Sequence, residues 1–340
     1  MSVHHSKSFK SLIGIIIAAA VLLFVCSSVR HALFQSTAFD LGYFDQATYL
    51  ISQGKPPIVS FWGFHFMGGH ADWIMYPIAL FYRLIPSVHW LLGIQAVALA
   101  LGALPTYYLA VQAGLKERLA LAIAAAYLLY PLIFNLNLFD FHPEVIALPL
   151  MLTAIWAARN RQMAGFVVCL VISLGCRDAL SLTIAAMGIW LMIFEKRRSY
   201  GAIALVLGIF WFWLVTQRII PHFRPDGVES VTRFAYLGSS LSEILKNLIL
   251  KPQLVLSALL TLKNLEYLLL VFAPIAWGLA LAHLAPLVAI VPTLAMNLLS
   301  TMDSQKDLLH QYSLPMLPFV LVAAIAALAH GKAWVQRPRS

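Results

Sequence analysis

Two aspartates follow the first long apolar run of the chain, in Phe39-Asp40-Leu41-Gly42-Tyr43-Phe44-Asp45-Gln46. A carboxylate at a membrane surface can act as a general base on a substrate delivered by a lipid. Asp40 is also well placed to cap a helix over residues 41–53, whose N-terminus would keep the carboxylate ionised. Five positions turn a helix by about 140°, so we expect only one of the two aspartates to face a cavity.

A second polar group lies in Phe64-His65-Phe66-Met67-Gly68-Gly69-His70-Ala71-Asp72. Two imidazoles and a carboxylate are ligand types that divalent metals accept, so His65, His70 and Asp72 are candidate ligands for a divalent cation. Their spacing matches no established metal-binding motif. His70 is therefore also a candidate for hydrogen bonding to a phosphate or a sugar.

A third group stands before an apolar run, in Leu138-Phe139-Asp140-Phe141-His142-Pro143-Glu144. Proline at the first helical position and glutamate in the first turn are ordinary features of a helix start. They explain Pro143 and Glu144, but not Asp140 and His142. Polar side chains at membrane depth are costly unless they face a cavity, so the segment is a candidate site.

The remaining candidates border later apolar runs. Arg177-Asp178 interrupts the apolar stretch 163–194. It is either a solvated, mutually neutralising turn or a phosphate clamp, because a guanidinium matches phosphate oxygens. His310 and Tyr312 precede the last apolar run. A membrane-interface position explains Tyr312, whereas His310 has no such explanation.

The composition identifies the elements that must position these residues. The chain is 61% hydrophobic and only 11% charged, about half the charged fraction of a soluble domain. Apolar runs of membrane-spanning length recur throughout. The sequence therefore predicts an all-α, polytopic helical membrane protein, a single transmembrane domain over 1–340. We place ten spans at 11–29, 88–111, 119–134, 143–158, 163–175, 179–194, 200–218, 264–281, 284–300 and 313–330.

The basic residues predict the orientation. They occupy short connections on one side of the spans, and the positive-inside rule makes that side cytoplasmic, with both termini inside. The residues concerned are Lys7, Lys10, Lys116, Arg118, Arg159, Arg161, Lys196, Arg197, Arg198, Lys332, Arg337 and Arg339. Topology thus accounts for most of the net charge of +9, and no nucleic-acid partner is expected. Three cysteines within or beside apolar runs indicate buried thiols rather than disulfides.

Two long loops and nearly all the acidic residues fall on the outer side. The first loop, 30–87, carries expected surface helices at 41–53 and 72–84, and the second, 219–263, carries an expected interfacial hairpin over 244–262, broken at Lys251-Pro252. The outer acidic residues are Asp40, Asp45, Asp72, Asp140, Glu144, Asp178, Asp226, Glu229, Glu243, Glu266, Asp303 and Asp307. This distribution indicates either simple tolerance of acids outside or an external active site.

An ordered set of motifs resembles the bacterial membrane proteins known as domain of unknown function 2079 (DUF2079). The set spans about residues 38–325 and comprises the Asp40 block, His70, Leu91-Leu92-x-x-Gln95, Pro105-x-Tyr107-x-Leu109-Ala110, Phe141-His142-Pro143-Glu144, Asn297-Leu298-Leu299-Ser300 and Tyr312-x-x-Pro315-x-x-Pro318-Phe319. That family is in turn similar to the GT-C glycosyltransferases, multi-span enzymes with polyprenyl-phosphate-linked sugar donors.

The resemblance implies a catalytic acid just after the first span, matched by Asp40. It also implies acidic or histidine residues before the fourth span, matched by Asp140, His142 and Glu144, and an acid matched by Asp178. The pattern departs from many such enzymes at Asp40-Leu41, where they carry paired acids, and in having no soluble domain after the last span.

The expectation is thus a glycosyltransferase of the bacterial cytoplasmic membrane with an outward-facing site and an unidentified acceptor, which is a glycan, a lipid or a protein. Its expected catalytic residues are Asp40 and Asp140, and the substrate-binding set is Asp45, His70, His142, Glu144, Arg177, Asp178, His310 and Tyr312. The alternative is a transporter or lipid flippase. The gathering of acids at one face and the lack of internal repeats favour the enzyme.

Overall fold

The computed structural model describes residues 7–225 and 229–336. Every regular element in these ranges is a helix, and an isolated bridge between Ile58 and His65 is the one β-type pairing among them. The all-helical prediction is confirmed for the described chain. Asp226, Arg337 and Arg339, assigned above to the two sides of the membrane, lie outside the described residues.

Five helical segments of the described chain are long and apolar enough to cross a membrane: Lys7–Ala32, His89–Gln112, Glu117–Phe139, Arg198–Phe223 and Gln311–Gln336. They coincide with the predicted spans 11–29, 88–111, 119–134, 200–218 and 313–330. Only the first, α1 (Lys7–Ala32), is one continuous α-helix. The second consists of α5 (His89–Leu101) and α6 (Ala103–Gln112), and the third of α7 (Glu117–Leu128) and α8 (Pro131–Phe139). The fourth consists of α12 (Arg198–Leu214), η3 (Val215–Ile219) and α13 (Ile220–Phe223), and the fifth of η9 (Gln311–Met316), α18 (Leu317–Ala329) and η10 (Trp334–Gln336).

The other predicted spans form shorter helices. These are α9 (Glu144–Arg159), α10 (Met163–Leu174), α11 (Leu180–Ile193), α16 (Leu262–Phe272) and α17 (Val291–Leu299). Proline at positions 274 and 286 explains two of the shortenings, because each lies in a 3-10 segment, η5 (Ala273–Gly278) or η7 (Ala285–Ile290), that adjoins the α-helix. The total of ten crossings stays a prediction.

The expected break at Lys251-Pro252 is confirmed. Helix α14 (Leu241–Leu250) ends there and α15 (Pro252–Leu259) begins with the proline, as expected for a residue that is accepted in the first turn of a helix. Helix α15 also forms a pair with the segment Leu262–Gly278 that is bent by 59° and is long enough for one broken span or a re-entrant loop. The interfacial hairpin therefore has this second interpretation.

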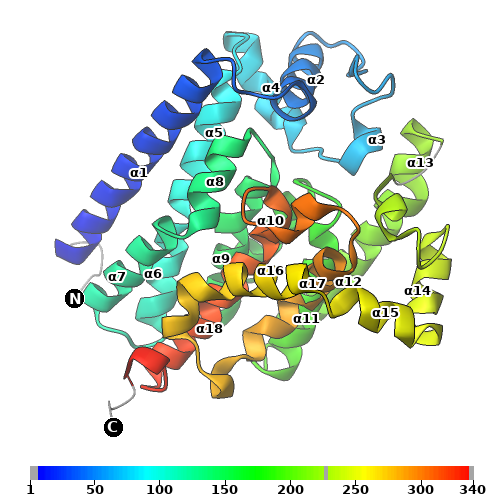
Figure 1. Ribbon diagram of the computed structural model, residues 1–340. Helices are drawn as coiled ribbons and strands as arrows, with labels where there is room; N and C mark the ends of the chain where they lie inside the picture. Colours follow the sequence, from blue (N-terminus) through cyan, green and yellow to red (C-terminus); the bar gives the residue numbers. More distant parts are fainter. Residues whose placement is uncertain (1–6, 226–228, 337–340) are drawn as a thin grey trace.

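Both short helices expected in the first long loop are present. Helix α2 covers Tyr43–Ser52 and α4 covers Met75–Leu84, with the short α3 (Met67–His70) between them. Helix α2 ends before Gly54, whose φ of 66° is a conformation that glycine adopts readily. Figure 1 shows α2, α3 and α4 together at one end of the molecule, beyond the ends of α5 and α8.

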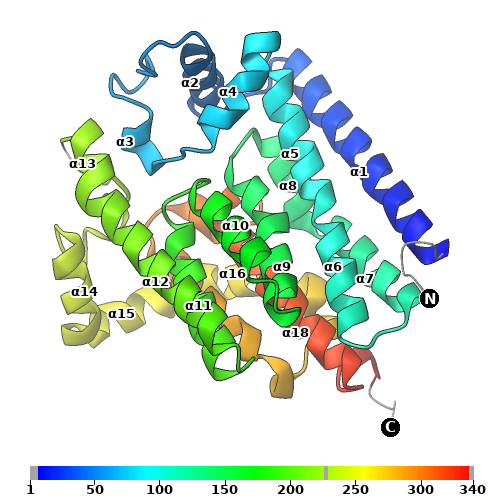
Figure 2. The same cartoon turned by 180° about the vertical axis from the view of Figure 1, so that it is seen from behind.

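The interior is built around α18 and its neighbours. Nearly every α18 residue is buried, and the largest fully buried side chain, Trp190 of α11, packs edge-to-face against Phe319. Helix α1 lies at the periphery and exposes one apolar side, as expected of a helix in contact with lipid. The start of α1 and the C-terminal end of α18 lie away from the end that carries α2–α4 (Figure 2).

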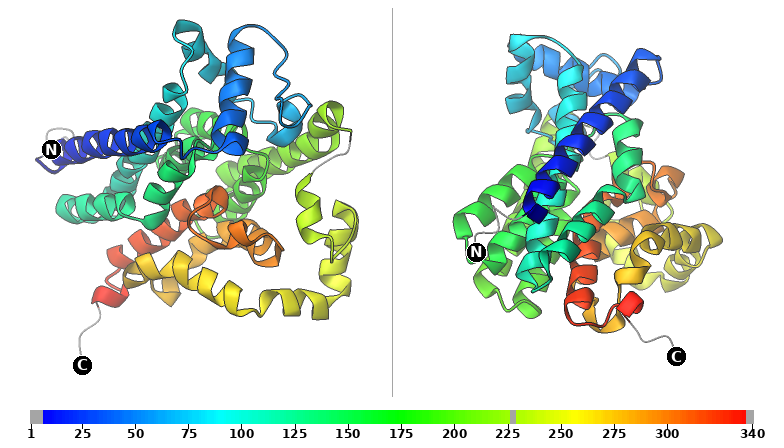
Figure 3. Two further views of the ribbon diagram at one scale, coloured as in Figure 1. Left: turned by 45° about the horizontal axis from the view of Figure 1, so that its top comes forward. Right: turned by 90° about the vertical axis from the view of Figure 1, so that its left-hand side faces the viewer.

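The segment 163–194 turns at Arg177-Asp178, as predicted. Its two arms do not form a tightly paired hairpin, however, because α10 packs mainly on α9 and α11 mainly on α12. Helices α14, α15 and α16 form an arch along another side of the molecule (Figure 3). The cysteines are free thiols, and both Cys169 and Cys176 are buried.

Candidate functional site

Asp40 lies in a π-helical turn, η2 (Ala38–Gly42), that precedes α2. The backbone N–H of Asp40 donates to the Thr37 hydroxyl oxygen (3.3 Å), and that hydroxyl donates to Asp40 Oδ2 (3.0 Å). The N-cap residue of α2 is Gly42, without a side-chain hydrogen bond. The expectation that Asp40 caps this helix is therefore wrong, because Thr37 caps the preceding turn and leaves the Asp40 carboxylate available.

The carboxylate of Asp40 faces the ring of His142. His142 Nε2 lies 3.3 Å from Asp40 Oδ1, and the imidazole stacks on Phe139 with a centroid separation of 5.1 Å. Burial raises the pKa of Asp40, but its hydrogen bond and charge interaction with His142, together with the Thr37 hydroxyl and the charge of Arg177, outweigh burial and lower it. Asp40 is therefore an ionised carboxylate at neutral pH.

The two ring nitrogens of His142 both face oxygen acceptors. Nδ1 lies 3.3 Å from the backbone oxygen of Asp140, and Nε2 faces Asp40. A neutral imidazole has one donor nitrogen, whereas an imidazolium has two. The ring of His142 therefore bridges the Asp40 carboxylate and the backbone of Asp140, and Asp40 and His142 form a carboxylate–imidazole couple.

Asp140 supports the Asp40–His142 couple without lining the cavity, and its contacts form the first part of a brace around the couple. Its side chain is only 1% exposed and forms an ion pair of 2.5 Å with Arg30 at the end of α1. Its second oxygen accepts from the backbone N–H of Thr37 at 2.7 Å. Asp140 also has a φ of 134°, a strained conformation for a residue with a Cβ atom, which persists only where the surroundings enforce it.

Gln95 of α5 completes the brace. Its amide nitrogen donates to the backbone oxygen of Asp140 (2.9 Å), and its amide oxygen accepts from the backbone N–H of His142 (3.0 Å). One fully buried side chain thus fixes both ends of the 140–142 turn. The position of His142 beside Asp40 follows from Gln95, Arg30 and Thr37 together.

A second network surrounds Arg177 at the turn between α10 and α11. Its guanidinium lies 2.6 Å from Glu144 Oε1 and 2.9 Å from His70 Nε2, and His70 Nδ1 lies 3.1 Å from Asp178 Oδ1. Because arginine only donates, His70 Nε2 must accept and Nδ1 must donate to Asp178. His70 therefore connects the guanidinium to the Asp178 carboxylate through its two ring nitrogens.

The charges of this network are set by burial and by one another. Burial lowers the pKa of Arg177, but the charges of Glu144 and Asp178 act in the opposite direction and outweigh burial, so the guanidinium is charged. Asp178 has a lowered pKa, because His70 and Arg177 outweigh burial. Burial instead raises the pKa of Asp72 well above its usual value; Arg177 opposes this shift, and Glu144 adds to it.

Asp72 therefore favours its protonated form. It is fully buried, and neither carboxyl oxygen has a hydrogen-bond partner among the described residues. The other cation-ligand candidates are dispersed, since His65 stacks on Phe223 at 4.1 Å and His70 is engaged by Arg177 and Asp178. In the described chain, no group of three or more His, Cys, Asp or Glu residues is arranged to hold a metal ion.

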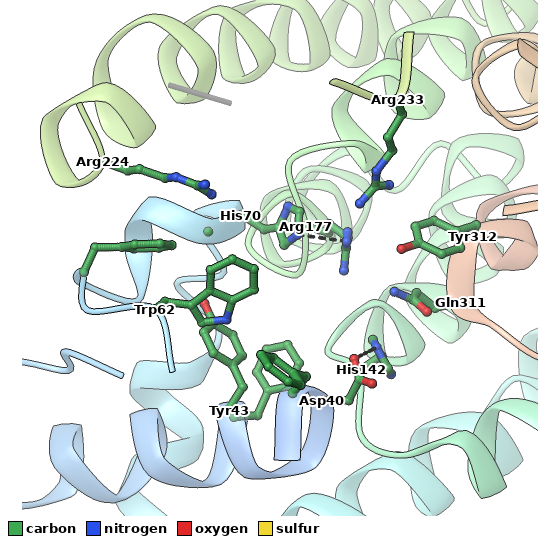
Figure 4. Close-up of a pocket in the computed structure, with 14 residues that line it drawn as sticks. Asp40, Tyr43, Trp62, His70, His142, Arg177, Arg224, Arg233, Gln311 and Tyr312 are labelled. Carbon is green, nitrogen blue, oxygen red and sulfur yellow. Dashed lines mark hydrogen bonds and ion pairs between the residues drawn. The ribbon is translucent and has the colours of Figure 1, made fainter. Parts of the chain in front are cut away.

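The two networks meet at a cavity of about 190 Å³ between the first loop and the core (Figure 4). Asp40 and His142 lie on one side of it, His70 and Arg177 lie across from them, and the side chains of Arg224 and Arg233 extend toward it from the second long loop. The described lining is completed by Phe39, Tyr43, Phe44, Trp62, Phe64, Gly69, Gln311 and Tyr312.

Aromatic rings support the two outer guanidinium groups. Arg224 lies over the ring of Phe64 at 4.8 Å and over that of Trp62 at 5.7 Å, and Arg233 lies over Tyr312 at 5.4 Å. A guanidinium stacked on a ring keeps its positive charge, and this charge attracts an anion. With Arg177, the cavity presents three guanidinium groups opposite one carboxylate–imidazole couple, an arrangement suited to an anionic substrate that loses a proton elsewhere.

The sequence candidates separate into three sets. Those that line the cavity are Asp40, His70, His142, Arg177 and Tyr312. Glu144 and Asp178 contact Arg177 and His70 from an adjoining pocket of about 90 Å³. The structure places Asp45, Asp140 and His310 away from both linings: Tyr82 donates to Asp45 at 2.7 Å, Arg30 pairs with Asp140, and His310 pairs with Asp307 at 2.8 Å.

Sequence reasoning missed Arg224 and Arg233. Both belong to a long loop assigned to the outer side, where basic residues are not explained by the positive-inside rule. This exception was the available signal, and it would have marked them as candidates for binding an anion. Arg30, Thr37 and Gln95 were missed as well, since their roles depend on contacts with a distant segment.

Comparison with known protein families places the chain in one of them. The family model described as "Predicted membrane protein (DUF2079)" matches residues 30–340, which begins at the arginine that braces Asp140 and includes the whole cavity lining. No curated protein matches the chain. With nearly its full length covered by the match, the chain belongs to the DUF2079 family of predicted membrane proteins.

Proposed function

We propose that the protein is a GT-C-like membrane glycosyltransferase that transfers a sugar from a polyprenyl-phosphate donor to an acceptor hydroxyl. The observation that carries the proposal is the placement of an ionised carboxylate and three arginines around one cavity. A transfer of this kind needs a base for the hydroxyl proton and a cationic site for the phosphate that leaves. Asp40 supplies the first, and Arg177, Arg224 and Arg233 supply the second.

In the proposed reaction, the acceptor oxygen attacks the anomeric carbon of the donor sugar. The bond from that carbon to the phosphate oxygen breaks, and its electron pair leaves with the lipid phosphate. The acceptor proton passes to Asp40, whose charge is balanced by His142 at 3.3 Å. Such contacts are often long before substrate is bound and shorten in the reactive complex.

The guanidinium groups act on the leaving phosphate. Arg177 is held by Glu144 and His70, so its orientation is fixed before substrate arrives. Donors fixed in advance stabilise developing charge without reorganising during the reaction. Asp140 is a positioning residue in this account, because its side chain contacts Arg30 and Thr37 rather than the cavity.

The proposal places the cavity on the outer face of the cytoplasmic membrane, in a chain that crosses about ten times with both termini inside. Two arrangements support this orientation. The α6–α7 connection, with basic Lys116, lies away from the end that carries α2–α4, as does the start of α1 (Figure 1). Segments expected to be cytoplasmic are thus separated from the cavity.

A transfer assay tests the proposal against the flippase alternative, which the buried charges around Arg177 also suit. The purified protein in liposomes would receive a polyprenyl-phosphate sugar labelled in the sugar, together with envelope material as acceptor. We expect the label to leave the lipid and free polyprenyl phosphate to accumulate. Movement of intact labelled lipid between leaflets, without free polyprenyl phosphate, would contradict the proposal and support a flippase.

A further inference from the structure

The cavity adjoins two others that lead away from Asp40. It shares His70, Arg177, Arg233, Gln311 and Tyr312 with the pocket of about 90 Å³. That pocket in turn shares four lining residues, Asp178, Ala179, Phe234 and Met296, with a groove of about 450 Å³. The three spaces therefore form a series that passes from the carboxylate, by way of two arginines, into the groove.

The groove is almost wholly apolar. It lies between α11 and α12 on one side and α14 and α17 on the other, and its lining includes Leu182, Phe212, Ile244, Leu245, Leu248 and Leu299. One of its few polar residues, Thr216, donates its hydroxyl hydrogen to the backbone oxygen of Phe212 at 2.8 Å. The lining thus has little to offer a polar ligand and much to offer a hydrocarbon chain.

The polarity of the series fits one class of molecule. An amphiphile with a phosphate and a long apolar chain would place its anion by the arginines and its chain against the leucines. We propose that the groove between α11–α12 and α14–α17 holds the apolar chain of a polyprenyl phosphate, with the phosphate between Arg177 and Arg233. The identity of the ligand as a polyprenyl carrier rests on the proposed function.

A larger apolar groove elsewhere does not have this continuity. It measures about 980 Å³ and lies among α1, α5, α6 and α9, with Val97 in its lining. None of its described lining residues also lines the cavity, the adjoining pocket or the α14 groove. A hydrocarbon chain bound in that groove would not lead to the cavity that contains Arg177 and Arg233. The groove therefore serves as an internal control.

Two matched substitutions test the assignment. Leu245→Trp narrows the α14 groove and Val97→Trp narrows the α1–α5 groove, at aliphatic positions that are 55% and 47% exposed. The probes are undecaprenyl phosphate and the short geranyl phosphate, both without a sugar, and affinity is measured by native mass spectrometry in detergent. We expect Leu245→Trp to weaken undecaprenyl phosphate about tenfold and to leave geranyl phosphate unchanged, while Val97→Trp changes neither.

Several results would overturn the assignment. They are an unchanged affinity of Leu245→Trp for undecaprenyl phosphate, an equal loss for the long and short probes, or a loss with Val97→Trp alone. Should Leu245→Trp fail to fold, a photoreactive undecaprenyl phosphate on the native protein replaces it. Crosslinks in α12 and α14 support the groove, and crosslinks confined to α1 and α5 contradict it.

This test is independent of sugar transfer, because neither a sugar nor an acceptor is present. Groove-dependent binding by a protein that transfers no sugar would keep this inference and end the glycosyltransferase proposal. Transfer that requires Asp40, in a protein whose binding of undecaprenyl phosphate is unchanged by Leu245→Trp, would support the glycosyltransferase proposal and contradict the assignment of the groove.

Discussion

His142 Nε2 lies 3.3 Å from Asp40 Oδ1, and each residue is held in place by a different part of the chain. Asp40 is fixed by the hydroxyl of Thr37, and His142 is fixed by the amide of Gln95. Asp140 joins the two supports, since its side chain accepts from the backbone of Thr37 and its backbone oxygen accepts from Gln95. The contacts of Thr37, Gln95 and Asp140 are thus connected, and together they fix the positions of Asp40 and His142.

The pH dependence of sugar transfer tests the couple. Protonation of Asp40 would remove the base, and its pKa lies below the ordinary 3.8, so activity should fall only as the pH drops below that value. In His142→Gln, burial still raises the pKa while the opposing charge is gone, and the acid limb should move to higher pH. His310→Gln, which alters a pair with Asp307 outside the cavity lining, is the control. If the acid limb of the pH profile lies at the same pH in the wild type, His142→Gln and His310→Gln, His142 does not lower the pKa of Asp40.

The brace can be tested through Arg30 and Asp140. Removing Arg30 leaves the buried Asp140 carboxylate without its counter-charge, and the loss of a partner in a fully buried ion pair costs about 3–5 kcal/mol; Arg30 is partly exposed, so the cost here should be smaller. Asp140→Asn and Arg30→Gln should each lower the free energy of unfolding and the kcat of transfer. Their double variant should cost less than the sum of the two, because they remove one interaction. A loss of activity in Asp140→Asn at wild-type stability, without a matching loss in Arg30→Gln, would instead make Asp140 a catalytic residue.

Arg233 tests the anion site. A hydrogen bond to a charged group contributes about 1.5–3 kcal/mol, so Arg233→Gln should weaken binding of a polyprenyl phosphate about 10- to 100-fold. Arg218→Gln is the matched control, because Arg218 lies over Trp213 at 5.9 Å and does not line the cavity. Isothermal titration in detergent would measure both. Equal affinities for the wild type and Arg233→Gln would exclude Arg233 from the phosphate site.

Asp72 makes a prediction about stability. Its pKa is raised in the folded protein, so the folded state keeps a proton that the unfolded state releases above the ordinary value of 3.8. The stability that this proton provides is complete below that value and is lost as the pH rises through the folded pKa. Asp72→Asn should therefore reduce the fall in Tm between about pH 5 and about pH 8. Asp303→Asn, at an exposed residue paired with Lys263, is the control. If Tm falls by the same amount in Asp72→Asn as in the wild type, Asp72 is ionised in the folded protein.

The sequence predicted the elements better than their connections. Apolar runs define α1 and α18 clearly, because a lipid-facing or buried helix must be apolar over its whole length. Length alone did not reveal that α16 and α17 are shortened by 3-10 segments at Pro274 and Pro286. It also did not reveal that α10 and α11 pack on different partners, since two apolar arms of similar length carry no information about which helices they contact.

For the candidate site, sequence reasoning selected residue types correctly but could not assign their partners. Asp40 was a candidate because a carboxylate at a membrane surface can act as a base. His142 was a candidate because polar residues at membrane depth need a reason, and the structure brings the two together. Asp140 had the same appearance in sequence, yet its side chain turns to Arg30. Such a choice depends on tertiary contacts between distant segments, which the sequence alone does not show.

Asp40 is the proposed base, and the most direct measurement of this role compares Asp40→Asn with Asp45→Asn in the labelled-sugar transfer assay. Both substitutions remove one carboxylate from the same short segment, but Asp45 contacts Tyr82 and not the cavity. At equal membrane abundance, Asp40→Asn should lower kcat by about 10²–10⁴, while Asp45→Asn keeps wild-type transfer. Full activity of Asp40→Asn would contradict the account.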